Sequence, residues 1–148
     1  MSKVVGVDDY VYKSAKELEA LSVLILSAMG CDEETARFVA FHLVDASLKG
    51  VDSHGVMRLN QYVEQANEGY FLPMGRPQLK QNGQGAWLVD GQRGFGMPAM
   101  RLAVDTAVAQ AKKQGISAVG VMNCGHTGRL GAFCEQGARA SCLIILFG

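Results

Sequence analysis

Residues 116–147, ISAVGVMNCGHTGRLGAFCEQGARASCLIILF, carry the pattern that decides the fold. Residues 116–123 are mostly small or β-branched and end at an asparagine, which predicts a short strand. Residues 130–140 predict a helix, and CLIILF, residues 142–147, predicts a second strand that is buried. A strand, a helix and a strand in this order are typical of a sheet with helices packed on it. We therefore expect an α/β unit at this end of the chain.

The segment that precedes this stretch predicts more of the same unit. PQLKQNGQGAWLVDGQ, residues 77–92, holds two strand-like runs about a glycine-rich turn, as a hairpin does. An alanine-rich helix is expected from about Pro98, in a first-turn position that suits proline, to Gly115. FLPMGRPQ, residues 71–78, has the proline and glycine content of a linker. We therefore place the α/β unit at residues 73–148.

Residues 1–72 predict a helical subdomain. Three segments with apolar residues at helical spacing each end at a glycine: residues 14–30, 32–50 and 53–69. Ser14 and Glu17 form a capping-box signature for the first helix, and Asp32 suits the start of the second. The residues that we expect to face the core in these two helices are Leu18, Leu21, Ile25, Met29, Ala36, Val39, Ala40 and Leu43. The whole chain is then a mixed α/β (α+β) protein, with helices first and a sheet with packed helices second.

The composition predicts a globular protein that binds neither nucleic acid nor membrane. Hydrophobic residues make up 49% of the chain, and 14 basic residues balance 14 acidic ones, so no net charge attracts a polyanion. The apolar runs are too short to span a bilayer, and acidic residues interrupt the N-terminus before a signal-peptide core forms. The four cysteines have no CxxC spacing, so we expect reduced thiols, a cytoplasmic location and no metal site.

The last predicted strand needs an element that covers it. A parallel strand buried on both faces requires a further crossover, and only Gly148 follows CLIILF. One interpretation is an edge strand covered by the preceding helices. The interpretation that we favour is that the polypeptide is a fragment of a larger domain.

VDSHGVMRLNQY, residues 51–62, gathers the side chains of a first candidate site. His54, Arg58 and Tyr62 are each four residues apart, which places them on one face of a helix. Ser53 is positioned to cap that helix, Arg58 has the planar fork that binds a carboxylate, and His54 can exchange a proton near neutral pH. The alternative is that Ser53 only caps the helix and that His54 and Arg58 are surface residues.

GHTGRLG, residues 125–131, is a second candidate site, because it lies between a predicted strand and a predicted helix. Residues that carry chemistry favour the carboxyl ends of strands in α/β sheets, where His126 lies. The glycines allow a ligand to approach the backbone, and the helix N-terminus with Arg129 favours a phosphate. The alternative is a glycine-rich connection whose histidine makes one local hydrogen bond. The remaining histidine, His42, is interpreted as a packing or surface residue.

GFGMPA, residues 94–99, fits the G-x-G-x-x-A dinucleotide fingerprint but not its context. The apolar strand before it ends several residues earlier, and the next strand ends in Asn123 rather than in an acid that would bind a ribose. We interpret this segment as a hairpin-to-helix loop, which argues against a Rossmann fold.

Three segments together resemble the type-2 malate/L-lactate dehydrogenases: DSHGVMRLNQYV, GQRGFGMPAMRLAVDTAVAQAKKQG and NCGHTGRLGAF. That family includes ureidoglycolate, sulfolactate and other hydroxycarboxylate dehydrogenases and some cyclic-imine reductases. The resemblance covers the chain from about Asp52 to its end. It implies an L-sulfolactate dehydrogenase-like fold, a homodimer, and hydride transfer between NAD or NADP and a small 2-hydroxy or 2-oxo acid.

The resemblance also implies roles for particular residues. Ser53 and His54 match a catalytic pair, and Arg58 matches the arginine that binds the substrate carboxylate. Tyr62, on the same predicted face as Arg58, is expected to bind the substrate with it. The histidine that matches His126 transfers the proton in some members. The segment that contacts the cofactor matches His126, Thr127, Gly128, Arg129 and Leu130. Family chains continue beyond this length, and much of the cofactor site lies in that later part.

Hydride transfer requires a proton-transfer group, a carboxylate clamp and the cofactor within a few ångströms of one carbon. We therefore predict that His54 and His126 line one cleft between the two parts of the chain. Two alternatives remain. In the first, the chain is a truncated, non-catalytic fragment that at most binds a ligand or a partner subunit. In the second, it is a metal protein with His54, Cys124 and His126 as ligands, although no typical ligand spacing supports that interpretation.

Overall fold

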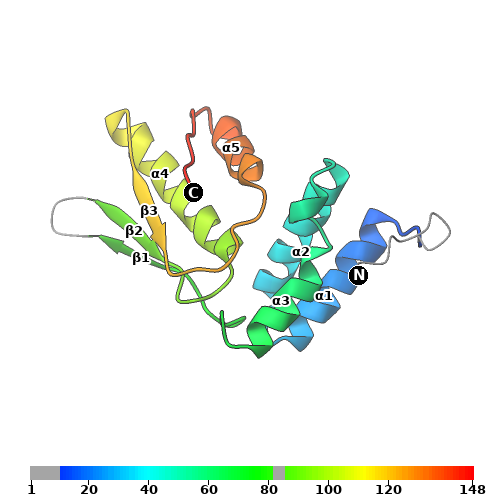
Figure 1. Ribbon diagram of the computed structural model, residues 1–148. Helices are drawn as coiled ribbons and strands as arrows, with labels where there is room; N and C mark the ends of the chain where they lie inside the picture. Colours follow the sequence, from blue (N-terminus) through cyan, green and yellow to red (C-terminus); the bar gives the residue numbers. More distant parts are fainter. Residues whose placement is uncertain (1–10, 82–85) are drawn as a thin grey trace.

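The computed structural model describes residues 11–81 and 86–148. The helices and strands, in chain order, are α1 (Ala15–Ala28), α2 (Glu33–Leu48), the 3₁₀ turn η2 (Asp52–His54), α3 (Arg58–Asn67), β1 (Gln78–Gln81), β2 (Trp87–Asp90), α4 (Gly96–Gln114), β3 (Val119–Met122) and α5 (Leu130–Arg139). Figure 1 shows α1, α2 and α3 gathered in one group and the sheet with α4 and α5 in another. Among the described helices, none combines the length and apolar character needed to cross a bilayer.

The two N-terminal helices begin where their capping residues predict. The Ser14 hydroxyl accepts a hydrogen bond from the Glu17 amide at 3.2 Å, and the Glu17 carboxylate accepts one from the Ser14 amide at 2.8 Å. The Asp32 carboxylate accepts a hydrogen bond from the Thr35 amide at 3.0 Å. These bonds satisfy amides that the helix itself leaves without a partner, which confirms both predicted starts.

The face of α1 that meets α2 differs from the predicted one. Ser22 and Leu26 are buried, whereas Leu21 is 52% exposed, so the placement of Leu21 in the core is wrong. Apolar residues lie on more than one side of α1, and only the packing direction against α2 selects which side is buried. In α2 the predicted core residues are confirmed, because Ala36, Val39, Ala40 and Leu43 are all fully buried.

The third helix begins later than predicted. The chain forms the 3₁₀ turn η2 and enters α3 only at Arg58, and the cap position Met57 makes no side-chain hydrogen bond. Ser53 therefore does not cap α3. The reason is a close approach to α2: Gly55 is buried at a place where a Cβ atom would lie 2.1 Å from the Ser47 hydroxyl, and that hydroxyl accepts a hydrogen bond from the Val56 amide at 3.1 Å.

The sheet is mixed and has the order β1-β2-β3. β1 and β2 pair antiparallel as the predicted hairpin, and the glycine-rich turn between them lies outside the described residues. β2 and β3 pair in parallel, with Trp87 opposite Val119. α4 connects these two parallel strands and ends at Gly115, whose φ of 89° suits a glycine. These features confirm the predicted fold class.

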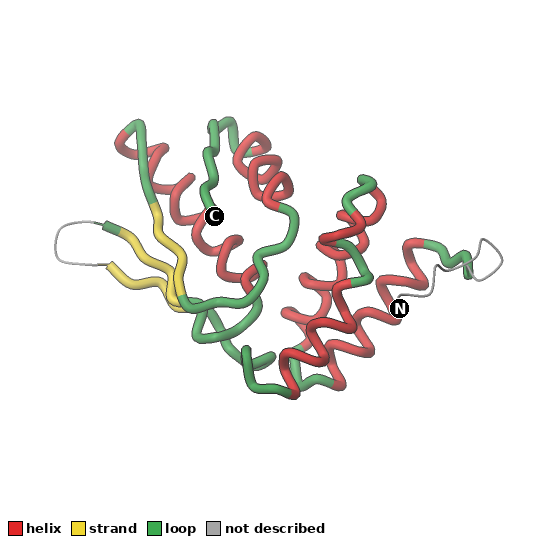
Figure 2. The backbone as a smooth tube through the Cα atoms, in the orientation of Figure 1, coloured by secondary structure: helices red, strands yellow, loops and turns green. Residues whose placement is uncertain are grey.

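The segment CLIILF does not form the predicted buried strand. Residues 142–148 carry no regular secondary structure, and Figure 2 shows them as a loop after α5. Leu143 is 90% exposed, whereas Ile144 packs against the main core. The segment lies against α5 at Gly137, where a Cβ atom would lie 2.0 Å from Ile144 Cγ1. Within the described residues no strand pairs with it, so its alternating side chains meet a helix on one side and solvent on the other.

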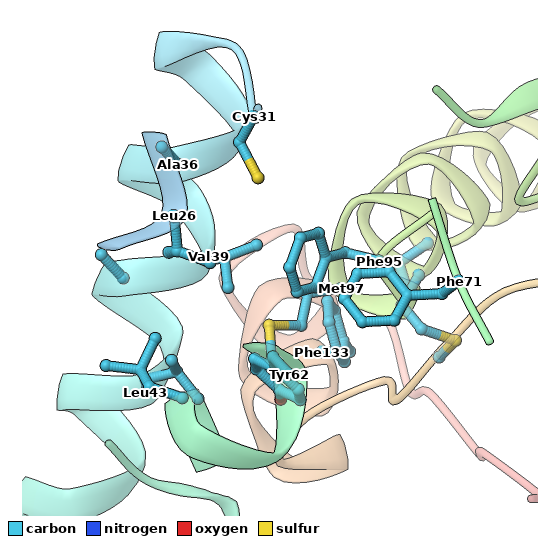
Figure 3. Packing of buried hydrophobic residues seen from close by; sticks show 14 residues of the cluster. Leu26, Cys31, Ala36, Val39, Leu43, Tyr62, Phe71, Phe95, Met97 and Phe133 are labelled. Carbon is cyan, nitrogen blue, oxygen red and sulfur yellow. The ribbon is translucent and has the colours of Figure 1, made fainter. Parts of the chain in front are cut away.

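One main core joins the helical part to the sheet-containing part. Figure 3 shows Leu26, Val39 and Leu43 of the helices facing a group of larger side chains. That group comprises Tyr62, Phe71, Phe95, Met97 and Phe133. A smaller cluster of Val89, Ala99 and Ala103 packs α4 on the sheet. The division into subdomains at residue 72 stays a prediction, since the largest side chains on both sides of it share one core.

Candidate active site

The imidazoles of His54 and His126 lie side by side. Their ring centroids are 5.0 Å apart and the ring planes make an angle of 40°. His54 ends η2, just before α3, and His126 lies in the loop between β3 and α5. The contact therefore joins the helical part to the sheet-containing part, and the predicted convergence of the two histidines is confirmed.

Tyr62 supplies the hydrogen bond that holds His126. Its hydroxyl oxygen lies 2.8 Å from His126 Nδ1. The tyrosine is only 2% exposed, and its ring packs edge-on against Phe71 and Phe95. Tyr62 is thus a core residue whose hydroxyl reaches the site, and not a member of an exposed polar face as the four-residue spacing suggests. Burial raises the pKa of the Tyr62 hydroxyl, so it stays protonated as a partner for the imidazole.

His126 is held in its neutral form. Burial lowers the pKa of this imidazole to about 4, and the nearby positive charge of Arg58 and the imidazole of His54 add to the effect. A neutral histidine can accept a proton on one ring nitrogen while the other keeps its partner. His126 therefore suits a proton-transfer step at neutral pH.

His54 has its own polar neighbour. The Ser53 hydroxyl lies 3.0 Å from His54 Nδ1, so the serine that does not cap α3 contacts the adjacent imidazole instead. Ser53 is exposed and His54 is half-buried, which leaves the pair accessible from solvent. The contact agrees with the expected pairing of these two residues in the site.

Arg58 is turned back over the 3₁₀ turn. Its Nε donates a hydrogen bond to the Ser53 carbonyl oxygen at 2.5 Å, and its Nη1 donates one to the Gln61 side-chain oxygen. Nη2 has no hydrogen-bond partner among the described residues. A substrate carboxylate can bind this free nitrogen. Sequence reasoning missed Gln61, although its position three residues after Arg58 on one helix would have indicated it.

The segment that follows His126 combines a buried glycine with an uncapped helix start. Gly128 has a φ of 75°, and a Cβ atom there would lie 3.1 Å from the Met97 side chain. Thr127 is half-buried, and Leu130 begins α5 without a side-chain cap. Among the described residues no side chain caps the Leu130 and Gly131 amides, whereas the Ala132 amide donates to the Arg129 oxygen.

Arg129 lies between two carboxylates rather than free in the loop. Its Nη2 is 3.0 Å from Asp45 and 2.8 Å from Glu135, and Lys49 contacts the same two acids at 3.0 and 2.8 Å. These ion pairs connect α2 to α5. The carboxylates of Asp45 and Glu135 neutralise the positive charge of Arg129 that would otherwise attract a phosphate. The Nε atom of Arg129 is buried, and none of the described residues offers it an acceptor.

The glycines of GFGMPA support the histidine loop. α4 begins at Gly96, two residues before the predicted start at Pro98, so only Gly94 and Phe95 of this segment lie in the connection from the hairpin to the helix. A Cβ atom at Gly96 would lie 2.3 Å from the Gly125 oxygen and 2.7 Å from the His126 oxygen. The glycine is needed because two backbone segments touch there, which explains the fingerprint-like spacing without a dinucleotide.

Two hollows lie away from the histidine pair. One of about 270 Å³ lies between α2 and α4 and includes Phe38, Arg76 and Arg101 in its lining. The other, of about 230 Å³, includes His42 and Glu135. Neither is lined by His54 or His126. His42 itself is 8% exposed and stacks on Phe133, as expected for a packing residue. The described part of the chain contains no group of three or more metal-binding side chains placed to hold an ion.

Comparisons with known proteins place this geometry in a family. The family model described as malate/L-lactate dehydrogenase matches residues 13–148. Hydroxycarboxylate dehydrogenase B of Escherichia coli (strain K12) is 33% identical over 133 residues, which are 90% of this chain and 37% of the relative. The (2R)-3-sulfolactate dehydrogenase (NADP(+)) of Chromohalobacter salexigens is 32% identical over 134 residues, covering 90% of this chain and 40% of that protein.

A solved structure agrees with the fold. The sulfolactate dehydrogenase from Methanocaldococcus jannaschii superposes with a TM-score of 0.79 and 28% identity, over 85% of this chain and 37% of that one. The chain therefore spans a little over a third of the length of the relatives that it matches, and the expectation of a sulfolactate dehydrogenase-like fold is confirmed over that part.

Proposed function

Because this chain belongs to the malate/L-lactate dehydrogenase family, we propose that it forms the substrate-binding and proton-transfer part of an NAD(P)-dependent 2-hydroxy acid dehydrogenase. The contact of His126 with both Tyr62 and His54 carries the proposal. A neutral imidazole fixed by a hydroxyl group is a suitable acid/base for a carbinol. Since the chain covers 37% of a relative, the whole reaction is proposed for the complete enzyme.

In the direction of oxidation, His126 accepts the proton of the substrate hydroxyl. The C–H bond of the same carbon breaks with its electron pair, and the carbinol becomes a carbonyl. When bound, NAD or NADP supplies the hydride acceptor for this step, and its reduced form supplies the hydride for the reverse. In the reverse direction His126 returns the proton to the carbonyl oxygen. His54, paired with Ser53, lies 5.0 Å from His126 between ring centroids and is the alternative donor.

The residues after His126 fit an anionic part of such a cofactor. The uncapped start of α5 offers backbone amides, and the buried Nε of Arg129 lacks an acceptor in the described part of the protein. The ion pairs of Arg129 with Asp45 and Glu135 argue against its guanidinium as the main phosphate ligand. We therefore assign the cofactor contact of residues 126–130 chiefly to their backbone, with the amides of Arg129 and Leu130 nearest the helix start.

Arg58 is proposed to bind the substrate carboxylate, with its free Nη2 making the first contact. Changing Arg58 to Lys removes the planar fork. In the complete enzyme this should cost about 1.5–3 kcal/mol of substrate interaction, the usual scale for a charged hydrogen bond. The measurement is kcat/KM for the 2-oxo acid, and an unchanged value would rule out the role. Arg37→Lys is the matched control, because Arg37 lies on α2 in an exposed pair with Glu33.

The 148-residue chain itself allows a direct test of binding. We would titrate short 2-oxo acids that carry methyl, carboxylate or sulfonate side chains and follow the three histidines by NMR. The signals of His54 and His126 should shift, whereas His42, stacked on Phe133, should not. Absence of any shift at saturating acid would count against the proposal. Turnover of NADH or NADPH is then measured on the complete enzyme, and binding of the acid without turnover there would favour the alternative of a ligand-binding module.

We also propose that the complete enzyme is a cytoplasmic homodimer. The four free thiols of the described chain support a reducing compartment. Large exposed apolar side chains on α1 and α2 support an interface: Leu21, Leu24, Phe41 and Leu48. Light scattering of the purified protein measures the assembly directly.

A further inference from the structure

Asp90 lies at the end of β2 and gathers three hydrogen bonds from three different segments. It is 7% exposed, and its carboxylate accepts from Lys80 Nζ at 2.7 Å, from the Gln92 amide at 3.0 Å and from Asn123 Nδ2 at 2.9 Å. Lys80 comes from β1, and Asn123 follows β3, so one carboxylate links all three strands. The bond from Lys80, with those from Gln92 and Asn123, lowers the pKa of Asp90 to about 2, and the group stays ionised.

The residues that Asp90 binds have unusual backbone conformations. Gln92, Arg93 and Asn123 have φ values of 52°, 58° and 53°, a left-handed region that side chains other than glycine rarely adopt. Such conformations persist only where the surrounding contacts over-determine them. Asp90 makes a direct bond to Gln92 and to Asn123, so its carboxylate holds two of these three residues in place.

From this strained turn, backbone hydrogen bonds lead to His126. The Arg93 amide donates to the Asn123 oxygen at 2.7 Å, the Gly125 amide to the Gly94 oxygen at 2.8 Å, and the Gly96 amide to the His126 oxygen at 3.2 Å. The turn after β2 and the loop after β3 are therefore bonded to each other at successive residues.

The same turn is also attached to the helical part. The Leu72 amide donates to the Arg93 oxygen at 2.7 Å, and the Arg93 guanidinium donates to the Gly69 carbonyl oxygen. Gly69 follows α3, the helix that carries Tyr62. Both sides of the contact between Tyr62 and His126 are thus tied to the turn that Asp90 organises.

We propose that Asp90 is a positioning residue, which acts through Asn123 and the turn at Gln92 and Arg93 to hold His126 against Tyr62 and His54. The effect of this role on catalysis rests on the proposed function, whereas the contacts that connect Asp90 to His126 do not depend on it. Asp90 would then set the orientation of the proton-transfer group without contacting the substrate.

The test is an NMR pH titration of the three histidines in Asp90→Ala without any ligand. Alanine removes the acceptor of all three bonds. Asparagine would keep an oxygen for Gln92 and Asn123, which both donate to Oδ1, and would lose only the bond from Lys80. We expect the His126 midpoint in Asp90→Ala to rise from about 4 towards the ordinary histidine range by a unit or more. His42, which stacks on Phe133, should titrate as in the wild type. A folded Asp90→Ala protein whose His126 titrates as in the wild type would overturn the proposal.

Two further variants keep the test decisive. Asp105→Ala is the matched control, because Asp105 is exposed on α4 and, within the described residues, its side chain accepts only from Gln136, so His126 should not change. If Asp90→Ala does not fold, Asn123→Gly removes the link to Asp90 and relieves the left-handed backbone. His126 should shift in that variant too, and an unchanged midpoint would count against the inference. If the wild-type chain does not bind the 2-oxo acids but His126 responds to these variants as expected, only the proposed function is refuted.

Discussion

His126 shows how one side chain can acquire its chemistry from residues that are distant in sequence. Tyr62, in α3, makes the hydrogen bond to His126 at 2.8 Å. Burial lowers the pKa of the His126 imidazole, and Arg58 and His54 lower it further. We could predict that the two histidines meet because the family resemblance implies proton-transfer groups and a carboxylate clamp around one substrate carbon. The sequence did not predict that Tyr62 is buried, since a tyrosine serves equally well as a core ring or as a polar surface group.

The lowered pKa of His126 predicts how the stability of the protein depends on pH. The folded-state pKa of about 4 lies below the value of about 6.5 for an unfolded chain, so the unfolded state binds the proton first. Stability is therefore full above about pH 6.5 and falls as the pH drops. Between pH 7 and pH 5 this group should cost on the order of 1–2 kcal/mol.

Urea unfolding of the wild type and of His126→Gln at these two pH values measures this contribution. The variant should lose less stability than the wild type over the same interval. His42, whose pKa burial also lowers, is present in both proteins, and its contribution cancels in the comparison. Equal losses in the two proteins would show that His126 is not held in its neutral form.

At the scale of helices and strands, local signals were reliable where the contacts are local. The capping bonds of Ser14 and Asp32 involve residues three positions away, and both helix starts were predicted correctly. The start of α3 was not, because Ser47 of α2 contacts Gly55 and Val56 across eight or nine positions. The segment 142–147 failed for a similar reason: its continuous apolar run predicts a strand, but a strand also needs a partner.

The break before α3 predicts that Gly55 cannot be replaced without cost. A Cβ atom there would lie 2.1 Å from the Ser47 hydroxyl and 3.3 Å from the Asp52 oxygen, so Gly55→Ala should destabilise the protein by about 1–3 kcal/mol. Chemical denaturation measures the change. In a Ser47→Ala background the hydroxyl is absent, and the same substitution should cost less. An equal cost in both backgrounds would mean that the contact with Ser47 does not set the start of α3.

At the scale of the whole molecule, one core unites the two parts that the sequence suggests are separate. Phe71 comes from the linker, Phe95 from the turn before α4, and Phe133 from α5 itself. All three share one cluster with Leu26 and Leu43. Periodicity identified the helices and the strands, but it carries no information about which faces meet. The position of the candidate site follows from that union, since each part contributes one of its two histidines.

Two neighbouring isoleucines in the C-terminal segment differ in burial, so substitutions at the two positions should have different effects on stability. Ile144 packs over Gly137 against the main core, whereas Ile145 is 68% exposed. Ile144→Ala should therefore lower the unfolding free energy by about 1–2 kcal/mol, near the lower end of the range for such a truncation in a core. Ile145→Ala should leave it almost unchanged, and thermal unfolding of the two variants makes the comparison.

The exposed side of the same segment should instead affect association. Leu143, Ile145 and Phe147 form an apolar row, 90%, 68% and 93% exposed, of the kind that drives contacts between copies. Ile145→Lys should reduce concentration-dependent self-association in sedimentation experiments without changing the melting temperature. If Ile144→Ala and Ile145→Ala were equally destabilising, the segment would not lie on α5 as described. Both side chains would then be buried, as in the strand that the sequence alone predicts.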